Sequence, residues 1–219
     1  MRLAYQGEPG AYSEAAALQY GGPQAETMPC KSFEDVFDAV SRQKATHGVV
    51  PLENSIGGTI HRNYDLLLDH DLTISGEVEL DVVHCLQALP GTKIGDITVV
   101  YSHPQALAQC EEFLASHHID PVPVHDTAGG ARMVAESGNV EDAAIASVEA
   151  GTNLGLAVLA EHIQTYPDNF TKFGVIGTDD AGLGPPGVDR ERRRAAEHEP
   201  RHRQPAGLEL APEFDDRGQ

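Results

Sequence analysis

The sequence predicts an α/β protein with mainly parallel sheets and one ligand cleft, and two observations carry this prediction. Short apolar runs alternate with segments of helical spacing along residues 1–178, which is the pattern of strands connected by helices. Polar loops follow directly after several of the apolar runs, around residues 54, 102 and 126. Ligands of open α/β sheets bind beyond the carboxyl ends of strands. The three loops therefore predict one shared cleft, between two lobes.

The first half of the chain contains three predicted strands or extended stretches and three predicted helices. The extended segments are expected at residues 3–6, 48–52 and 72–83. Helices are expected at residues 13–18, 33–40 and 60–68. Ser13 stands where a helix cap is expected. The second helix has Phe33, Val36, Phe37 and Val40 at helical spacing.

The second half repeats this alternation. Strands are expected at residues 97–101, 121–124, 143–146 and 174–176, with a strand or loop at 156–163. Helices are expected at residues 104–114, 128–136 and 148–153. Pro104 stands in a first helical turn, where proline is tolerated, and Asp126 or Thr127 is expected to cap the next helix.

The charge of the chain excludes several classes of partner. The 219 residues include 34 acidic and 15 basic side chains, a formal net charge of −19. Nucleic acids and anionic membranes need clustered Lys and Arg, so neither is an expected partner. Few cations within the first 178 residues are available for an anionic ligand: Arg2, Lys31, Arg42, Lys44, Arg62, Lys93, Arg132 and Lys172.

The cysteines and the N-terminus indicate a cytoplasmic protein. Three cysteines without a CxxC motif argue against disulfides and against a zinc site. The first ten residues lack the apolar region of a signal peptide. No run approaches the roughly 18 apolar residues of a membrane helix. The composition after residue 178, rich in Pro, Gly, Arg and Glu, predicts a disordered tail over 179–219, with a solvated helix around 190–199 as the alternative.

Six motifs together resemble the prephenate dehydratase family, and its plant-type arogenate dehydratase branch most closely. They are AYQGEPGAYSEAAA (4–17), VPLENSIGGTIHRNYDLLL (50–68), HCLQALPG (84–91), YSHPQALAQC (101–110), DTAGGA (126–131) and DNFTKF (168–173). The resemblance implies two α/β lobes similar to periplasmic binding proteins, with the active site in the cleft. It places a catalytic domain at residues 1–178, with one lobe at about 1–80 plus 164–178 and the other at about 81–163.

The reaction that the resemblance implies is a decarboxylating dehydration. A cyclohexadiene loses CO2 from its ring carboxylate and water from a hydroxyl across the ring. Prephenate then gives phenylpyruvate, for L-phenylalanine biosynthesis, and arogenate gives phenylalanine directly. The protein has to help hydroxide leave, hold two carboxylates and keep the site dry.

The resemblance makes Thr171 the catalytic threonine, which donates a hydrogen bond to the departing hydroxyl. The alternative is that Thr171 is an ordinary β-branched strand residue. Asn169 is expected to position the substrate or Thr171. Lys172 stands where the family usually has Arg, and a lysine binds a carboxylate as a point charge rather than bidentately.

The family's ENS loop matches Glu53, Asn54 and Ser55. Asn54 and Glu53 are expected to act in catalysis, although Glu53 has a capping or solvated role as its alternative. Ser55 and the amides of residues 57–59 precede a helix, which suits them to a substrate carboxylate.

Further substrate-binding residues follow from the other motifs. Ser102 and Gln109 match hydrogen-bonding positions of the family, with an ordinary surface glutamine as the alternative for Gln109. Thr127 is expected to contact a carboxylate or amine, or else to cap its helix. Residues at the end of the first strand should also lie in the cleft: Tyr5, Gln6 and Gly7.

Several other site types find no support. His61, His84 and His103 match no metal-ligand spacing, so we expect them to be structural. The chain contains no GxGxxG and no GxxxxGK[ST] motif, and we expect no cofactor. Family members usually carry a C-terminal ACT domain that binds phenylalanine, and residues after 178 do not resemble it. A homodimer is compatible with the resemblance, and a non-catalytic ligand-binding relic is the competing class of function.

Overall fold

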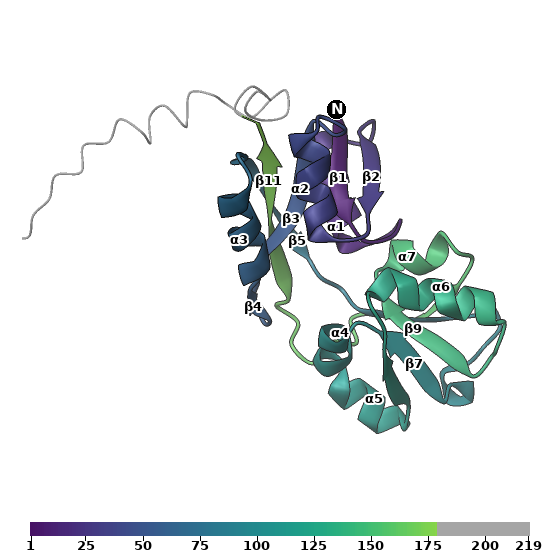
Figure 1. Cartoon of the computed structure of the whole chain (residues 1–219). Coiled ribbons are helices and arrows are strands. Elements are labelled where there is room, and N and C mark those ends of the chain that lie inside the picture. Colours follow the sequence, from purple (N-terminus) through teal and green to yellow (C-terminus); the bar gives the residue numbers. More distant parts are fainter. Residues whose placement is uncertain (179–219) are drawn as a thin grey trace, which may run out of the picture. The chain divides into compact units, whose positions relative to one another are not determined.

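The computed structural model describes residues 1–178 and contains two separate β-sheets (Figure 1). The first sheet has the strand order β2-β1-β3-β11-β5, and β4 pairs with β3. Its strands are β1 (Arg2–Gln6), β2 (Glu26–Cys30), β3 (His47–Asn54), β4 (Gly58–Thr59), β5 (Thr73–Asp81) and β11 (Phe170–Gly177). Its helices are α1 (Tyr12–Gly21), α2 (Phe33–Ser41) and α3 (His61–Asp69). We call this sheet and its helices the first lobe.

The second sheet has the order β10-β6-β9-β7-β8. Its strands are β6 (Cys85–Ala88), β7 (Val99–Ser102), β8 (Asp120–Pro123), β9 (Asp142–Ala146) and β10 (Ala157–Ala160). Its helices are α4 (Pro104–Gln109), α5 (Glu111–His117), α6 (Thr127–Ser137) and α7 (Val148–Thr152), with a 3-10 turn η1 (Ile94–Asp96). We call this sheet and its helices the second lobe. The predicted disordered tail lies outside the described residues.

The prediction of an α/β protein is confirmed, but the prediction of mainly parallel sheets is wrong. Strand β11 runs antiparallel to both β3 and β5, and β6 runs antiparallel to both β9 and β10. The reason is the path of the chain. It leaves the first sheet after β5 and returns along β11, which therefore enters that sheet from the opposite end. The alternation of apolar runs in the sequence does not indicate the direction in which a strand enters its sheet.

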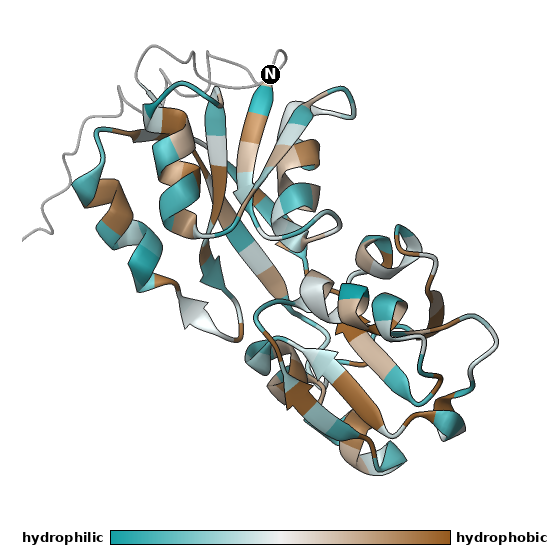
Figure 2. Ribbon diagram, turned by 45° about the vertical axis from the view of Figure 1, so that its right-hand side comes forward, coloured by the Kyte–Doolittle hydropathy of each residue, from teal (hydrophilic) through white to brown (hydrophobic). Residues whose placement is uncertain are grey.

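Helix α2 forms as its apolar spacing predicts. Val36, Phe37 and Val40 are buried in the core of the first lobe. Ser32 and Asp35 form a capping box, in which each side chain accepts a hydrogen bond from the other residue's backbone N–H. Figure 2 shows hydrophobic and hydrophilic segments in alternation along the helices, as expected for helices with one buried face.

Three helices differ from the prediction. Helix α3 buries Asn63 and Leu66 and leaves Leu68 87% exposed, because the Asn63 amide donates to the carbonyl of Pro51 and turns that face inward. The single helix expected at 104–114 is two helices that meet at Cys110. Helix α1 is not capped by Ser13, since its N-cap is Ala11, which makes no side-chain cap bond.

The loop between β1 and α1 packs closely against α7 of the second lobe. The Ser147 hydroxyl donates to the carbonyl of Gly10 at 2.7 Å. Gly10 has a φ of +89°, and a Cβ at this position would lie 2.4 Å from the Cα of Ala150. Glycine is required here for two reasons, the left-handed backbone conformation and the lack of space.

We expect Gly10→Ala to destabilise the protein more than Gly22→Ala. Gly22 also has a positive φ, of +81°, but nothing lies within 4 Å of a Cβ built there. The Gly22 variant should therefore lose about 1 kcal/mol from backbone strain alone. The Gly10 variant should lose about 1–3 kcal/mol more, from overpacking against Ala150. Urea unfolding measures both, and equal losses would contradict the close contact between the β1–α1 loop and α7.

Candidate active site

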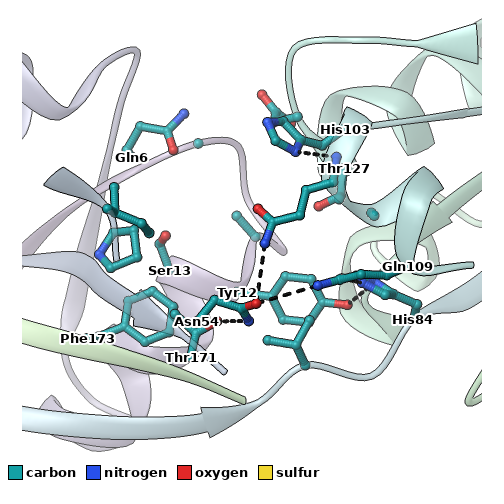
Figure 3. A pocket seen from close by; sticks show the side chains of 18 of the residues that line it. Gln6, Tyr12, Ser13, Asn54, His84, His103, Gln109, Thr127, Thr171 and Phe173 are labelled. Carbon is teal, nitrogen blue, oxygen red and sulfur yellow. Dashed lines mark hydrogen bonds between the residues drawn. The ribbon is translucent and has the colours of Figure 1, made fainter. Parts of the chain in front are cut away.

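A pocket of about 340 Å³ lies between the two lobes (Figure 3). The first lobe contributes residues from the start of α1, from β3 and from β11. The second lobe contributes the starts of α4 and α6. The lining residues are Gln6, Gly7, Ala11, Tyr12, Ser13, Phe33, Pro51, Asn54, Ile60, Val82, His84, His103, Gln105, Ala106, Gln109, Asp126, Thr127, Thr171 and Phe173. A volume near the lower end of the usual range suits a small ligand.

The pairing of β3 with β11 places Asn54 directly beside Thr171. Their Cα atoms are partners in the antiparallel ladder, and the register shifts between Lys172 and Phe173. Lys172 pairs with Glu53 and Phe173 pairs with Pro51, so β3 contains one extra residue at this point. Bulges of this kind are common beside active sites, where they redirect side chains. Here the bulge lets Pro51 and Asn54, three positions apart, both line the pocket.

The Asn54 side chain has one orientation only, because backbone N–H groups hold its oxygen. Oδ1 accepts from the N–H of Gly57 at 2.6 Å and from that of Ile56 at 3.1 Å. Its Nδ2 therefore faces the other way and donates to the Oγ1 of Thr171 at 3.0 Å. Thr171 Oγ1 is thus an acceptor in this contact, so its own hydrogen remains available for a group in the pocket.

A chain of buried hydrogen bonds continues from Asn54 to other residues at the pocket. Asn54 Nδ2 also donates to Asn169 Oδ1 at 2.8 Å, and Asn169 Nδ2 donates to Gln109 Oε1 at 3.3 Å. Gln109 Oε1 lies 2.7 Å from His84 Nε2, which must carry a hydrogen for this contact. Nδ1 of His84 lies 3.2 Å from the Tyr12 hydroxyl. In this series of hydrogen bonds, the orientation of each side-chain amide follows from the orientation of the amide before it.

Burial keeps His84 neutral. The side chain is 2% exposed, and desolvation lowers its pKa below the ordinary value of 6.5, although the contact with Gln109 opposes this shift. In the neutral ring with hydrogen on Nε2, Nδ1 is an acceptor. Burial also raises the pKa of Tyr12, so its hydroxyl keeps its proton and donates to the carbonyl of Val83 at 2.6 Å. The Tyr12 hydrogen is thus directed to Val83, and the hydroxyl oxygen lies beside Nδ1 of His84.

The pocket contains few charged groups. Among the described residues that line it there is no Lys or Arg, so none of the eight cations expected to be available for an anion is placed there. One acidic residue, Asp126, lies in the lining. Helices α1 and α6 both begin at the pocket, and the free N–H groups of a helix start favour anions.

The structure brings six of the predicted site residues together in the pocket. These are Gln6, Gly7, Asn54, Gln109, Thr127 and Thr171. Asn169 is 2% exposed and lies behind them, bonded to Asn54 and Gln109. Figure 3 shows Gln6, Ser13 and Phe173 on one wall, with His103 and Thr127 facing them. The predicted roles of these residues stay predictions at this point.

The remaining five predicted residues do not line the pocket. Tyr5 is fully buried on the face of β1 opposite to Gln6, since side chains alternate along a strand. Glu53 and Lys172 are Cα partners on β3 and β11. Each is next to a strand residue that lines the pocket, but neither lines it. Ser102 is buried and donates to the carbonyl of Ile145 at 2.6 Å.

Ser55 has a structural contact in place of the expected ligand contact. Its hydroxyl donates to the carbonyl of Asp168 and accepts from the N–H of Phe170, both at 3.0 Å. Its own N–H donates to the carbonyl of Phe170 at 2.9 Å. Ser55 therefore fixes the segment just before Thr171.

Sequence reasoning missed several pocket residues. His84 and His103 were expected to be structural, yet both line the pocket. Asp126 was expected as a possible cap in one of the polar loops of the cleft, but not as a site residue; it caps α6 through Gly129 and also lines the pocket. Tyr12 and Ser13 follow β1 as the polar loops follow other strands, which is the signal that could have identified them.

Two further classes of site find no support in residues 1–178. No cluster of three or more His, Cys, Asp or Glu side chains in this range is arranged to hold a metal ion. No helix in the same range is both long and apolar enough to cross a bilayer.

Comparisons with known proteins identify relatives of the chain. The relative named arogenate dehydratase/prephenate dehydratase 1, chloroplastic, from Arabidopsis thaliana is 49% identical over 82% of this chain and 45% of its own length. The chain therefore spans less than half the length of this curated relative. A solved prephenate dehydratase from Arthrobacter aurescens, in complex with L-Phe, has a TM-score of 0.77 at 30% identity, over 84% of this chain and 62% of its own.

Another solved structure, described as GqqA, a novel type of quorum quenching acylase, has a TM-score of 0.76 at 37% identity, over 85% of this chain and 67% of its own. The family model for prephenate dehydratase matches residues 3–181. The chain belongs to the prephenate dehydratase family.

Proposed function

We propose that this chain catalyses the decarboxylating dehydration of prephenate to phenylpyruvate, with arogenate as the alternative substrate. The observation that supports this most is the contact between Asn54 and Thr171. Asn54 occupies one lone pair of the Thr171 hydroxyl and leaves its hydrogen free to donate to a ligand in the pocket. A fixed donor of this kind stabilises negative charge on the departing hydroxyl as the C–O bond breaks.

The lack of cations in the pocket supports decarboxylation. When the bond to the ring carboxylate breaks, its electron pair enters the ring and the carboxylate charge disappears from the leaving CO2. A Lys or Arg paired with that carboxylate would stabilise the ground state more than the transition state, and would slow the reaction. Neutral donors and helix starts hold a carboxylate less strongly, which suits a group that must lose its charge.

The apolar part of the lining suits the ring. Phe33, Ile60, Val82 and Phe173 surround the pocket together with neutral amides. These side chains exclude water and offer a surface for a flat product. Aromatisation of the ring supplies much of the driving force, so the site needs no cofactor and no covalent intermediate.

We assign the roles of the predicted residues accordingly. Thr171 is the catalytic donor, Asn54 orients it, and Asn169 and Gln109 hold Asn54. Thr127 and the start of α6 contact a carboxylate. Glu53, Ser55 and Lys172 act indirectly, by shaping the paired strands on which Asn54 and Thr171 lie. The replacement of the family's usual Arg by Lys172 then has little effect on substrate affinity.

Two other functions are less well supported. The solved structure described as GqqA is named an acylase. Acyl transfer needs a nucleophile that is hydrogen-bonded to a general base. Within the described residues, the hydroxyl groups of Ser13 and Thr171 make no hydrogen bond to a histidine, and Thr171 contacts an amide. A ligand-binding relic would have no use for an oriented Thr171 hydroxyl beside a small pocket.

We also propose that the protein works in a reducing, cytoplasmic environment. Its cysteines are free and buried, and burial raises the pKa of Cys85 to about 11 and that of Cys110 to about 12. Such thiols are inert and show no tendency to pair. The word chloroplastic belongs to the name of the Arabidopsis relative. Association into a homodimer stays a prediction.

We expect Thr171→Val to abolish most of the activity and Thr171→Ser to keep it. Valine matches the shape of threonine without the donor, and the loss of one positioned donor lowers kcat by about 100- to 1,000-fold. Serine keeps the hydroxyl and should stay within about 10-fold of the wild type, since only a methyl group is lost. Phenylpyruvate formation from prephenate measures both, against the spontaneous rate. Equal activity of the valine and serine variants would contradict the role of the hydroxyl.

We expect the stability of the protein to fall as the pH falls below 6.5, and His84→Gln to reduce that fall. Burial lowers the folded-state pKa of His84, so the unfolded chain binds more protons between that pKa and 6.5. Stability therefore rises with pH through this window and is lost below it. Glutamine keeps a donor towards Gln109 without titrating. Urea unfolding from pH 5 to 7.5 measures the slope, and an unchanged slope in the variant would contradict a neutral His84.

A further inference from the structure

Asp126 has an unusual position among the residues that line the pocket. It is the acidic residue of the described lining, which contains no Lys or Arg. As the N-cap of α6, it accepts a hydrogen bond at Oδ1 from the N–H of Gly129, at 2.6 Å. Its Oδ2 accepts no hydrogen bond from the residues that the structure describes. One carboxylate oxygen therefore serves the helix, and the other is available to a ligand.

A negative charge at this place is unfavourable for one of the two candidate substrates. Prephenate carries two carboxylates and a keto group, so its complex would hold three negative charges with no cation in the lining. Arogenate carries an ammonium in place of the keto group. Opposite charges a few ångström apart attract strongly in a partly buried site, and like charges repel there. The charge of Asp126 thus favours the binding of arogenate and disfavours the binding of prephenate.

The neighbours of Asp126 suit the rest of an α-amino acid group. Thr127 also lines the pocket, and it begins helix α6, whose first backbone N–H groups favour a carboxylate. An acid next to free N–H groups offers one partner for an ammonium and one for the adjacent carboxylate. The arrangement is complementary to a zwitterion and not to a keto acid.

We propose that Asp126 is a specificity-determining residue that binds the substrate ammonium and so raises kcat/KM for arogenate, the alternative substrate named above, relative to that for prephenate. The proposal rests on the dehydratase function proposed above. Two histidines of the described residues, His103 and His125, belong to the same group of interacting charges as Asp126. His103 already accepts the N–H of Gln105 at Nδ1, and burial lowers its pKa, so it offers Asp126 no positive charge at neutral pH.

The test compares kcat/KM for arogenate and for prephenate in the wild type, in Asp126→Asn and in a charge control. Asparagine caps a helix as well as aspartate does, so Asp126→Asn removes the charge and keeps the start of α6. Asp81→Asn removes one charge from an exposed residue outside the pocket lining. Asp126→Asn should lower kcat/KM for arogenate by about 10- to 100-fold, the effect of losing one hydrogen bond between charged groups. Its kcat/KM for prephenate should stay the same or rise, and Asp81→Asn should leave the ratio of the two substrates unchanged.

The two proposals fail in different ways. An unchanged substrate ratio in Asp126→Asn, in an active enzyme, would overturn the role of Asp126 and leave the dehydratase function intact. No turnover of either substrate by the folded wild type would refute the dehydratase function. Titration calorimetry with arogenate and prephenate would then test the role of Asp126. Compared with the wild type, Asp126→Asn must bind arogenate at least 10-fold more weakly and prephenate no more weakly. Equal affinities in wild type and variant would overturn it.

Discussion

The direction of the Asn54 amide is the constraint on which the site depends. Backbone N–H groups of residues 56 and 57 hold its oxygen, and these groups can only donate. Asn54 must therefore donate to Thr171, and Thr171 must direct its own hydrogen elsewhere. The same amide sets the direction of Asn169, then of Gln109, and with it the position of the hydrogen on His84. One tight turn after β3 thus orders a network that reaches across both lobes.

The lack of Lys and Arg in the described pocket lining suits the proposed decarboxylation. A dehydratase that releases CO2 gains little from a strong cation beside the ring carboxylate, because that charge is lost in the transition state. The described pocket lining offers helix starts and neutral amides instead of Lys or Arg. The role proposed for Asp126 depends on the same feature, because a single charge has a large effect in a described lining without Lys or Arg.

The sequence predicted the α/β class, most strands and helices, and the loops that form the pocket. It did so because apolar periodicity and the polar residues after strands are local signals. The antiparallel return of β11, which places Thr171 opposite Asn54, depends on pairing between residues more than 100 positions apart and has no local signal. The bulge in β3 decides that Asn54 faces the pocket, while Glu53 next to it lies outside the lining. Ser55 and Ser102 were predicted to contact the ligand, but both hydroxyls donate to backbone carbonyls. The sequence cannot distinguish these two roles, because either one needs only a serine at that position.

A double-mutant cycle between Asn54 and Thr171 tests the central claim most directly. In Asn54→Asp the carboxylate still accepts from the N–H of Gly57, but its second oxygen accepts from Thr171 and turns that hydrogen away from the pocket. The account predicts that Asn54→Asp and Thr171→Val each lower kcat by about 100-fold or more. It also predicts that kcat of the double variant lies within about threefold of kcat of the less active single variant. Losses that multiply in the double variant, with all three proteins cooperatively folded, would show that Asn54 does not act through Thr171.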